Sequence, residues 1–316
     1  MARPFRFSAR VPDFTTSSQW KDDLARIEDS GYSTISVPDH FMGPAGYEPF
    51  TYMAAIAVAN DRLRIVSLVA GNDYRHPVVL HKSAANIDLF SGGRLELGIG
   101  AGWMLADYEA AGIAYDAPGI RVSRFEESVR VIKGLFAPGP FSFEGKHYRI
   151  TNLDGLPEPV QKPHPPILIG GGGKRLLSFA AREADIIGVN TTIKDGVLTP
   201  SQRAGFNADL TDTRVGWVND AMRACGRSLD DVELQAIVYH CVVTSSQSET
   251  DAALGRLSAL YELPPAELNE SPAVLVGTVD ACVDRLRERR DRWGINYVTI
   301  NDVAEGAPIV SKLAGA

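Results

Sequence analysis

The 316-residue sequence has few cysteines and no long uninterrupted apolar run. Its three cysteines, Cys225, Cys241 and Cys282, are odd in number and form no CxxC pair, which favours buried free thiols in a reducing cytosol. No stretch of 18 apolar residues occurs, and the first residues lack the apolar core of a signal peptide. We therefore predict a cytoplasmic protein without a membrane partner.

An excess of basic charge is also missing. The chain has 32 Lys+Arg against 39 Asp+Glu, which gives a formal net charge of −7. A duplex-binding protein needs a basic footprint, and the arginines of the segment DRLRERRDRW stand among acids, so we expect no nucleic-acid partner. No HExxH or paired-cysteine spacing occurs, so we expect no bound metal. No GxSxG occurs either, so no serine nucleophile of that type is indicated.

What the sequence does contain is a repeat of strand-like and helix-like segments in its first hundred residues. Strand-like runs start at Pro4, Ser33, Arg64 and Arg94. A helical apolar spacing fills each gap between these runs. Strands that alternate with helices at this interval are typical of βαβ units and a parallel sheet.

The three helices in these gaps have recognisable boundaries. The first contains Trp20, Leu24 and Ile27 at helical spacing, with Ser17 or Ser18 as its N-cap. The second is predicted from Pro49 to about residue 60, and the third from Pro77 to the residue before Ser91, because proline is favoured in the first helical turn.

The regular alternation of strand-like and helix-like segments stops after residue 100 and then continues with insertions. We predict helices over 122–136, 174–184, 212–225, 249–262 and 279–293, a hairpin over 141–150, strands over 165–170, 185–190, 233–243 and 296–300, and a short last helix. Residues 191–211 show no pattern and are predicted as a loop.

These segments give eight strand candidates, and eight units of about thirty residues fit the usual size of a TIM barrel. We predict a single (β/α)8 TIM-barrel domain over residues 1–316, in the α/β class. Its surplus length lies in insertions at about 101–120, 138–165 and 190–211, with specificity carried by loops 43–48, 101–120 and 190–211. The alternative is an open doubly wound sheet, which would need fewer strands and an early glycine fingerprint.

Two glycine clusters follow predicted strands. Gly98, Gly100 and Gly102 form GxGxG, which is not the dinucleotide fingerprint GxGxxG. The second cluster, Gly170–Arg175, reads GGGGKR and is not a Walker A loop, but it opens a helix after a strand. Backbone N–H groups there favour an anion, and Lys174 or Arg175 adds charge. The alternative is a turn that needs glycine for a positive φ.

The segment VPDHF places Asp39 and His40 directly after the second strand, at the face where a barrel keeps its active site. Histidine is well suited to move protons near neutral pH, although a single histidine there could also be structural. Trp103 could stack on a ring or close the barrel rim. Asp107, in the loop that follows, is expected to be solvated or to cap a helix.

Together, SVPDHF, LHKSAANIDLFSGGRLELGIGAGW, FEGKHYRI, PILIGGGGKRLLSFAAREADIIGVN and VGTVDACVDRLRERRDRWGINYVTI resemble the bacterial luciferase-like flavin superfamily over nearly the whole chain. Within it, the chain is most similar to actinobacterial F420-dependent oxidoreductases. The sugar-phosphate dehydrogenase branch has an acid immediately after GxG, where this chain has Ala101, so that branch's substrate is not implied.

The resemblance implies a barrel that binds F420 or FMN at its carboxyl-terminal face. It implies that the cofactor is contacted by three segments: Val69, Ala70, Gly71 and Asn72, with a non-prolyl cis bond often found there; Gly100, Ala101 and Gly102; and Gly171, Gly172, Gly173, Lys174 and Arg175. His40 and Asp39 are the implied catalytic residues. Trp103 is expected in the substrate cavity, as is His76, which precedes the third helix.

Three functions follow as hypotheses. The first is an F420-dependent oxidoreductase that transfers a hydride to or from a small-molecule substrate while His40 moves the proton. The second is an FMN-dependent two-component monooxygenase, whose partner is a flavin or F420 reductase. The third is a flavin-binding barrel without catalysis. A homodimer is expected, with the apolar helices after strands two and three as the interface.

Overall fold

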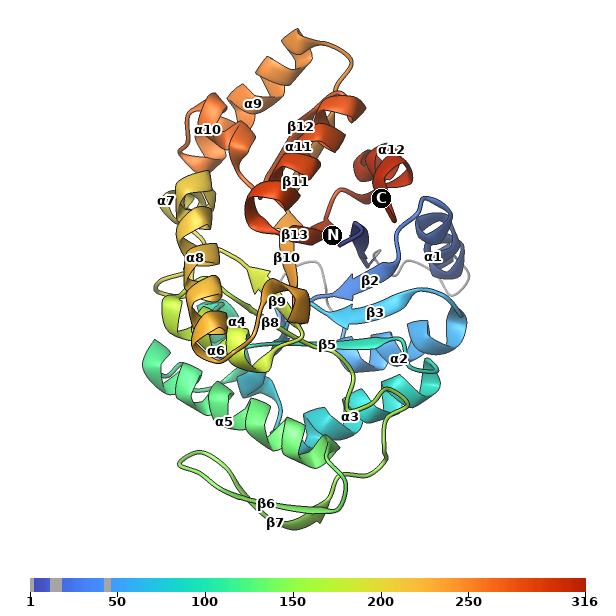
Figure 1. Cartoon of the computed structure of the whole chain (residues 1–316), viewed down its shortest axis with the longest axis vertical. Helices are drawn as coiled ribbons and strands as arrows, with labels where there is room; N and C mark the ends of the chain where they lie inside the picture. Colours follow the sequence, from blue (N-terminus) through green and yellow to red (C-terminus); the bar gives the residue numbers. More distant parts are fainter. Residues whose placement is uncertain (1–2, 12–18, 43–46) are drawn as a thin grey trace. The chain divides into compact units, whose positions relative to one another are not determined.

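The computed structural model describes residues 3–11, 19–42 and 47–316, and the predicted N-cap at Ser17 or Ser18 lies outside them, as does most of loop 43–48. The chain divides into two compact units. Unit 1 comprises residues 1–36 and 170–316, and unit 2 comprises residues 37–169. Figure 1 shows the elements in the colours of the sequence.

In the part of the chain that the structure describes, eight parallel strands of the main sheet lie at the places that the sequence predicts. They are β1 (Arg6–Arg10), β2 (Thr34–Val37), β3 (Arg64–Ser67), β5 (Leu95–Gly100), β8 (Ile167–Gly171), β9 (Ile186–Val189), β10 (Glu233–Val238) and β13 (Ile295–Ile300). A two-residue strand, β4 (Ala70–Gly71), continues the path of β3 and pairs with β5.

The order of hydrogen-bonded strands is β3-β2-β1-β13-β10-β9-β8-β5-β4, and β3 also pairs with β5. The order therefore closes on itself, whereas an open doubly wound sheet has two unpaired edges. The prediction of a (β/α)8 barrel is confirmed. Two of its strands, β2 and β8, run across the division between the units.

Among the described residues, eight helices alternate with these strands. They are α1 (Gln19–Asp29), α2 (Pro49–Ala59), α3 (Pro77–Phe90), α5 (Pro118–Phe136), α6 (Lys174–Glu183), α8 (Ala208–Ala224), α11 (Val279–Trp293) and α12 (Val303–Leu313). The predicted helix starts at Pro49 and Pro77 are confirmed: each proline fills the first turn, where its missing N–H costs no hydrogen bond.

The insertions contain more structure than their sequence patterns indicate. The hairpin of β6 (Pro140–Glu144) and β7 (Arg149–Asp154) is antiparallel as predicted and lies beside α5 (Figure 1). Its apolar side chains pack with those of α5. The predicted loops are wrong in part. Residues 101–120 contain α4 (Leu105–Ala111), and residues 191–211 contain α7 (Pro200–Arg203), the 3-10 turn η2 (Ala204–Phe206) and the start of α8. Two further 3-10 turns are η1 (Asn72–Tyr74) and η3 (Leu229–Asp231).

The single long strand predicted over 233–243 is also wrong. The chain leaves the barrel at Tyr239, and β11 (His240–Val243) pairs with β12 (Val274–Gly277) in a separate two-stranded sheet. The helices α9 (Gln247–Tyr261) and α10 (Pro265–Glu270) cover a second apolar core on this sheet. A continuous apolar run cannot indicate that two halves pair with different partners.

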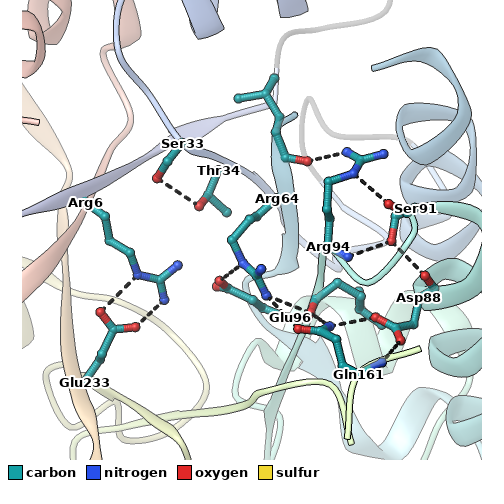
Figure 2. A network of polar contacts seen from close by, with 12 residues as sticks. Arg6, Ser33, Thr34, Arg64, Asp88, Ser91, Arg94, Glu96, Gln161 and Glu233 are labelled. Carbon is teal, nitrogen blue, oxygen red and sulfur yellow. Dashed lines mark hydrogen bonds and ion pairs between the residues drawn. The ribbon is translucent and has the colours of Figure 1, made fainter. Parts of the chain in front are cut away.

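A polar network in unit 2 surrounds the amino ends of β3 and β5 (Figure 2). Arg64 Nε lies 2.6 Å from Oε1 of the buried Glu96, and Arg64 also donates to Gln161. Gln161 in turn donates to Asp88 at 2.6 Å. In TIM barrels this end of the strands serves stability, and catalysis takes place at the opposite end.

Within the described residues, no helix is long and apolar enough to cross a membrane.

The three cysteines are free thiols. Cys241 and Cys282 are buried, but Cys225 is exposed, which corrects the expectation that all are buried.

Candidate active site at the carboxyl ends of the strands

Asp39 follows β2 and is bound to the loop that follows β4. Its carboxylate accepts the backbone N–H of Gly71 at 2.9 Å and pairs with both Nη atoms of Arg75, at 2.5 and 3.2 Å. Burial alone would lower the pKa of Arg75, but its hydrogen bonds and ion pairs with Asp39 and Glu48 raise it overall. Asp39 is buried and both its oxygens accept hydrogen bonds. It therefore links the end of β2 to the segment that contains Gly71 and Arg75.

His40 forms a short hydrogen bond with a buried carboxylate. Its Nδ1 lies 2.6 Å from Oδ2 of Asp107, whose side chain is fully buried, whereas the imidazole is 27% exposed. The ring of Trp103 stands edge-on to the imidazole, with centroids 5.7 Å apart. The imidazole therefore has one nitrogen held by the protein and a ring orientation restricted by two neighbours.

Asp107 is a candidate site residue that the sequence pattern did not reveal. The expectation of a solvated or helix-capping side chain is wrong, because Asp107 lies in the first turn of α4 and its side chain is fully buried. Besides the His40 contact, Oδ1 accepts the backbone N–H groups of Phe41 and Met42 at 2.9 and 2.8 Å. The Tyr74 hydroxyl lies 3.3 Å from Oδ2, and burial, with the charge of Asp107, raises the pKa of Tyr74.

The glycines at the end of β5 are required by packing within unit 2. A Cβ on Gly98 would meet the backbone oxygen of Ser67, and one on Gly100 would lie 2.7 Å from Cγ2 of Val69. The segment after β3 therefore lies directly against β5. Ala101 is buried and Gly102 has a positive φ of 78°.

The segment from Val69 to Asn72 has a cis peptide bond between Leu68 and Val69, and Ala70 and Gly71 form β4. The side chain of Asn72 is fully buried, and its amide nitrogen lies 3.2 Å from Oδ1 of Asp73 and 3.4 Å from the hydroxyl of Tyr148. Its amide nitrogen is thus directed to those two residues, whereas its buried Oδ1 has no hydrogen-bond partner among the described residues.

His76 is an exposed helix cap. Its Nδ1 accepts the backbone N–H of Val78 at 3.3 Å at the start of α3, and its ring faces Tyr148 with centroids 5.5 Å apart. This contact gives His76 a structural role as the N-cap of α3, because its Nδ1 accepts a backbone N–H that has no partner within the helix.

The loop Gly170–Arg175 belongs to unit 1 and links β8 to α6. None of its glycines has a positive φ, which excludes the interpretation that the cluster serves a left-handed turn. A Cβ on Gly172 would meet the Thr191 carbonyl group and lie 2.6 Å from the Thr192 nitrogen, and one on Gly171 would lie 2.5 Å from Leu176 Cδ2. These glycines therefore allow a close approach of two backbone segments.

The start of α6 has the features of an anion site. Gly173 is the N-cap and provides no side-chain hydrogen bond, and Lys174 and Arg175 are exposed in the first turn. Behind the loop, the buried Arg214 donates to the carbonyl oxygens of Gly172 at 3.4 Å and Gly205 at 2.6 Å. Burial lowers the pKa of Arg214. No sequence pattern indicates this residue, because it lies within an amphipathic helix.

Within unit 2, the structure brings together Asp39, His40 and Gly71 with the end of β5 and Trp103. The predicted phosphate-binding residues Gly171–Arg175 form their own group in unit 1.

Comparisons with known proteins give consistent results. Residues 16–199 match the family model described as luciferase-like monooxygenase. The FMNH(2)-dependent dimethylsulfone monooxygenase of Pseudomonas putida is 28% identical over 215 residues, which span 62% of this chain and 59% of that protein. The F420-dependent glucose-6-phosphate dehydrogenase of Amycolatopsis mediterranei (strain U-32) is 28% identical over 66% of this chain and 60% of its own length.

The fold has relatives among solved structures. The coenzyme F420-dependent tetrahydromethanopterin reductase from Methanopyrus kandleri superposes with a TM-score of 0.74 over 98% of both chains, at 18% identity. At this identity the similarity establishes the fold, and it agrees with the closed strand order.

Proposed function

The chain belongs to the luciferase-like monooxygenase family, and we propose that it is an F420-dependent oxidoreductase that transfers a hydride between the deazaflavin and a small organic substrate. The relative from Amycolatopsis mediterranei supports this choice of cofactor. The relative from Pseudomonas putida favours a second candidate, an FMN-dependent monooxygenase supplied by a separate reductase.

The glycine loop fits the phosphate that F420 and FMN share. A Cβ would fill the space at Gly171 and Gly172, the N-cap Gly173 makes no side-chain hydrogen bond, and Lys174 is exposed in the first turn of α6. Helix N-termini with free N–H groups bind phosphate through their hydrogen bonds and positive dipole end. We assign the cofactor phosphate to Gly171, Gly172, Gly173, Lys174 and Arg175.

The observation that carries the proposal is the pairing of His40 with the buried Asp107 at the carboxyl end of β2. When bound, the deazaflavin supplies a two-electron carrier that accepts or donates hydride. Oxidation of an alcohol also releases a proton, and His40 is placed to accept it; in the reverse direction His40 returns it to the carbonyl oxygen. Such general acid–base catalysis contributes about 10²–10⁴-fold to the rate.

The other predicted residues take supporting roles in this proposal. Asp39 braces the loop that carries His40 through Gly71 and Arg75 and does not move a proton. The backbone of Val69–Gly71 and of Gly100–Gly102 backs the cofactor ring, and Trp103 limits the substrate cavity beside His40.

The first test is cofactor binding, measured by quenching of tryptophan fluorescence with F420 and with FMN in separate titrations. Tight binding of F420 and weak binding of FMN is expected. Tight binding of FMN, with oxygen consumption in the presence of a flavin reductase, would replace the proposal by the monooxygenase. Tight binding of F420 without turnover of any alcohol or carbonyl compound in a panel would leave a flavin-binding barrel without catalysis.

The second test is the variant His40→Ala. Its dissociation constant for F420 should stay within a few-fold of wild type, while turnover falls by about 10²–10⁴-fold. His147→Ala is the matched control, because His147 lies in the hairpin and contacts Ser123. Equal turnover of His40→Ala and wild type would remove His40 from the mechanism.

We also propose a homodimer through α2 and α3 of unit 2. These helices pack on each other and present large apolar side chains to solvent: Val58 is 70% exposed and Phe90 is 57% exposed. Val79 and Leu89 are exposed as well. A second copy of the chain would remove this apolar surface from water.

A further inference from the structure

We propose that Asp107 is a positioning residue that sets the tautomer of His40, so that the proton of the neutral imidazole lies on Nδ1 and Nε2 is the proton acceptor. The inference rests on the proposed role of His40 in proton transfer. It assigns a function to a residue whose hydrogen bonds go to the segment His40–Met42 and to Tyr74.

The contacts of Asp107 make it an acceptor. Its Oδ1 receives two backbone N–H groups, from Phe41 and Met42, which can only donate. Its Oδ2 lies 2.6 Å from Nδ1 of His40 and 3.3 Å from the hydroxyl of Tyr74. With backbone donors on Oδ1 and the Tyr74 hydroxyl on Oδ2, Asp107 faces His40 as an acceptor.

The hydrogen bond to His40 therefore runs from Nδ1–H to Asp107. In a neutral imidazole one nitrogen donates and the other accepts, and the partner of the first determines the state of the second. Nε2 consequently keeps its lone pair. Because Nδ1 is occupied and Trp103 stands edge-on to the ring, Nε2 is the nitrogen that remains to meet a substrate hydroxyl.

This arrangement gives a balanced proton step. When an alcohol is oxidised, its O–H bond breaks and the proton goes to Nε2, while a bound deazaflavin would supply the acceptor for the hydride of the C–H bond. The electron pair of that O–H bond forms the carbonyl π bond. The imidazolium that results lies beside the buried Asp107 carboxylate, which offsets its charge.

The same carboxylate also holds the segment after His40. Phe41 and Met42 are 46% and 49% exposed, and the Phe41 ring lies 4.5 Å from that of Tyr74. A substitution at Asp107 could therefore disturb this segment, so the test needs a readout that reports the imidazole itself.

That readout is the nitrogen NMR spectrum of cofactor-free protein labelled with ¹⁵N-histidine. We expect His40, assigned by its loss in His40→Ala, to show the Nδ1–H tautomer in the wild type. Asp107→Asn should shift the population toward Nε2–H, the form that free histidine favours in water. Turnover of this variant should fall by about 10²–10⁴-fold, the range for loss of a correctly protonated base.

Asp73→Asn is the matched control. Asp73 is another buried acid of unit 2, but it pairs with Arg124 and Tyr108 and makes no contact with His40 among the described residues. It should leave the tautomer of His40 unchanged. An Nε2–H tautomer in the wild type, or no change of tautomer in a folded Asp107→Asn variant, would overturn the inference.

The wild-type spectrum is decisive even if Asp107→Asn does not fold. Failure of the proposed function is recognised separately, because it would appear as absence of cofactor binding or turnover, whereas the tautomer is measured without cofactor.

Discussion

The replacement Gly172→Ala tests whether the glycine loop of unit 1 is shaped by close backbone contact. The added Cβ would lie 2.6 Å from the Thr192 nitrogen and closer still to the Thr191 carbonyl group. Ordinary contacts to carbon begin at about 3.5 Å, so one backbone segment must move by roughly 1 Å. Backbone atoms cannot rotate away as a side-chain end can.

The magnitude follows from this geometry. Overpacking of a filled site costs about 1–3 kcal/mol, and because the obstacle is backbone we expect about 3 kcal/mol. The displaced loop should also lose at least one hydrogen bond to a charged phosphate. Such a bond is worth about 1.5–3 kcal/mol, which corresponds to about 10–150-fold in the dissociation constant of F420.

Urea unfolding followed by tryptophan fluorescence measures the first effect. With a slope near 3 kcal/mol/M, we expect the midpoint to fall by about 1 M. Gly173→Ala is the control at the next position, because its Cβ would meet no atom within 4 Å and its φ of −91° suits alanine. That variant should stay within about 1 kcal/mol of wild type. If both variants unfold at the wild-type midpoint and bind F420 equally well, the close-contact explanation of the loop is wrong.

Two further predictions concern unit 2. Burial, helped by the charge of Lys82, lowers the pKa of His81 from 6.5 to about 4. The unfolded state therefore binds more protons than the folded state between these pH values. As the pH falls from 7 to 4, the free energy of unfolding of the wild type should fall by up to about 3 kcal/mol relative to that of His81→Leu, as measured by urea unfolding at each pH. Phe90→Glu should convert a dimer into a monomer in size-exclusion chromatography with light scattering, because it places a charge in the exposed apolar surface; a wild-type monomer would refute the proposed interface.

Most of the barrel could be predicted from the sequence because each of its units satisfies a local rule. Apolar runs of the right length form the strands, and prolines at 49 and 77 mark helix starts. Where partners are distant in the chain, the local rule failed. The run from Glu233 is uniformly strand-like, but its first half pairs with β9 and β13 and its second half with β12.

The candidate site, like the barrel, could be predicted only where it depends on a local rule. His40 was identified because it directly follows a strand, and strand ends of a parallel barrel share one face. Asp107 is 67 residues away in the sequence, in a segment that has no helical pattern strong enough to be recognised. Arg214 occupies a position of α8 that an ordinary surface arginine could fill.

The sequence by itself thus determined the eight-stranded barrel, the glycine loop before α6 and the place of His40, because these depend on local periodicity and on the rule that strand ends meet. Only the tertiary structure decided which carboxylate holds His40, that Asp39 is bound by Arg75, and that Gly172 is needed for contact with Thr191. These facts are distances between residues far apart in the chain, and hydrogen bonds and steric contacts depend on tenths of an ångström that no spacing along a sequence specifies.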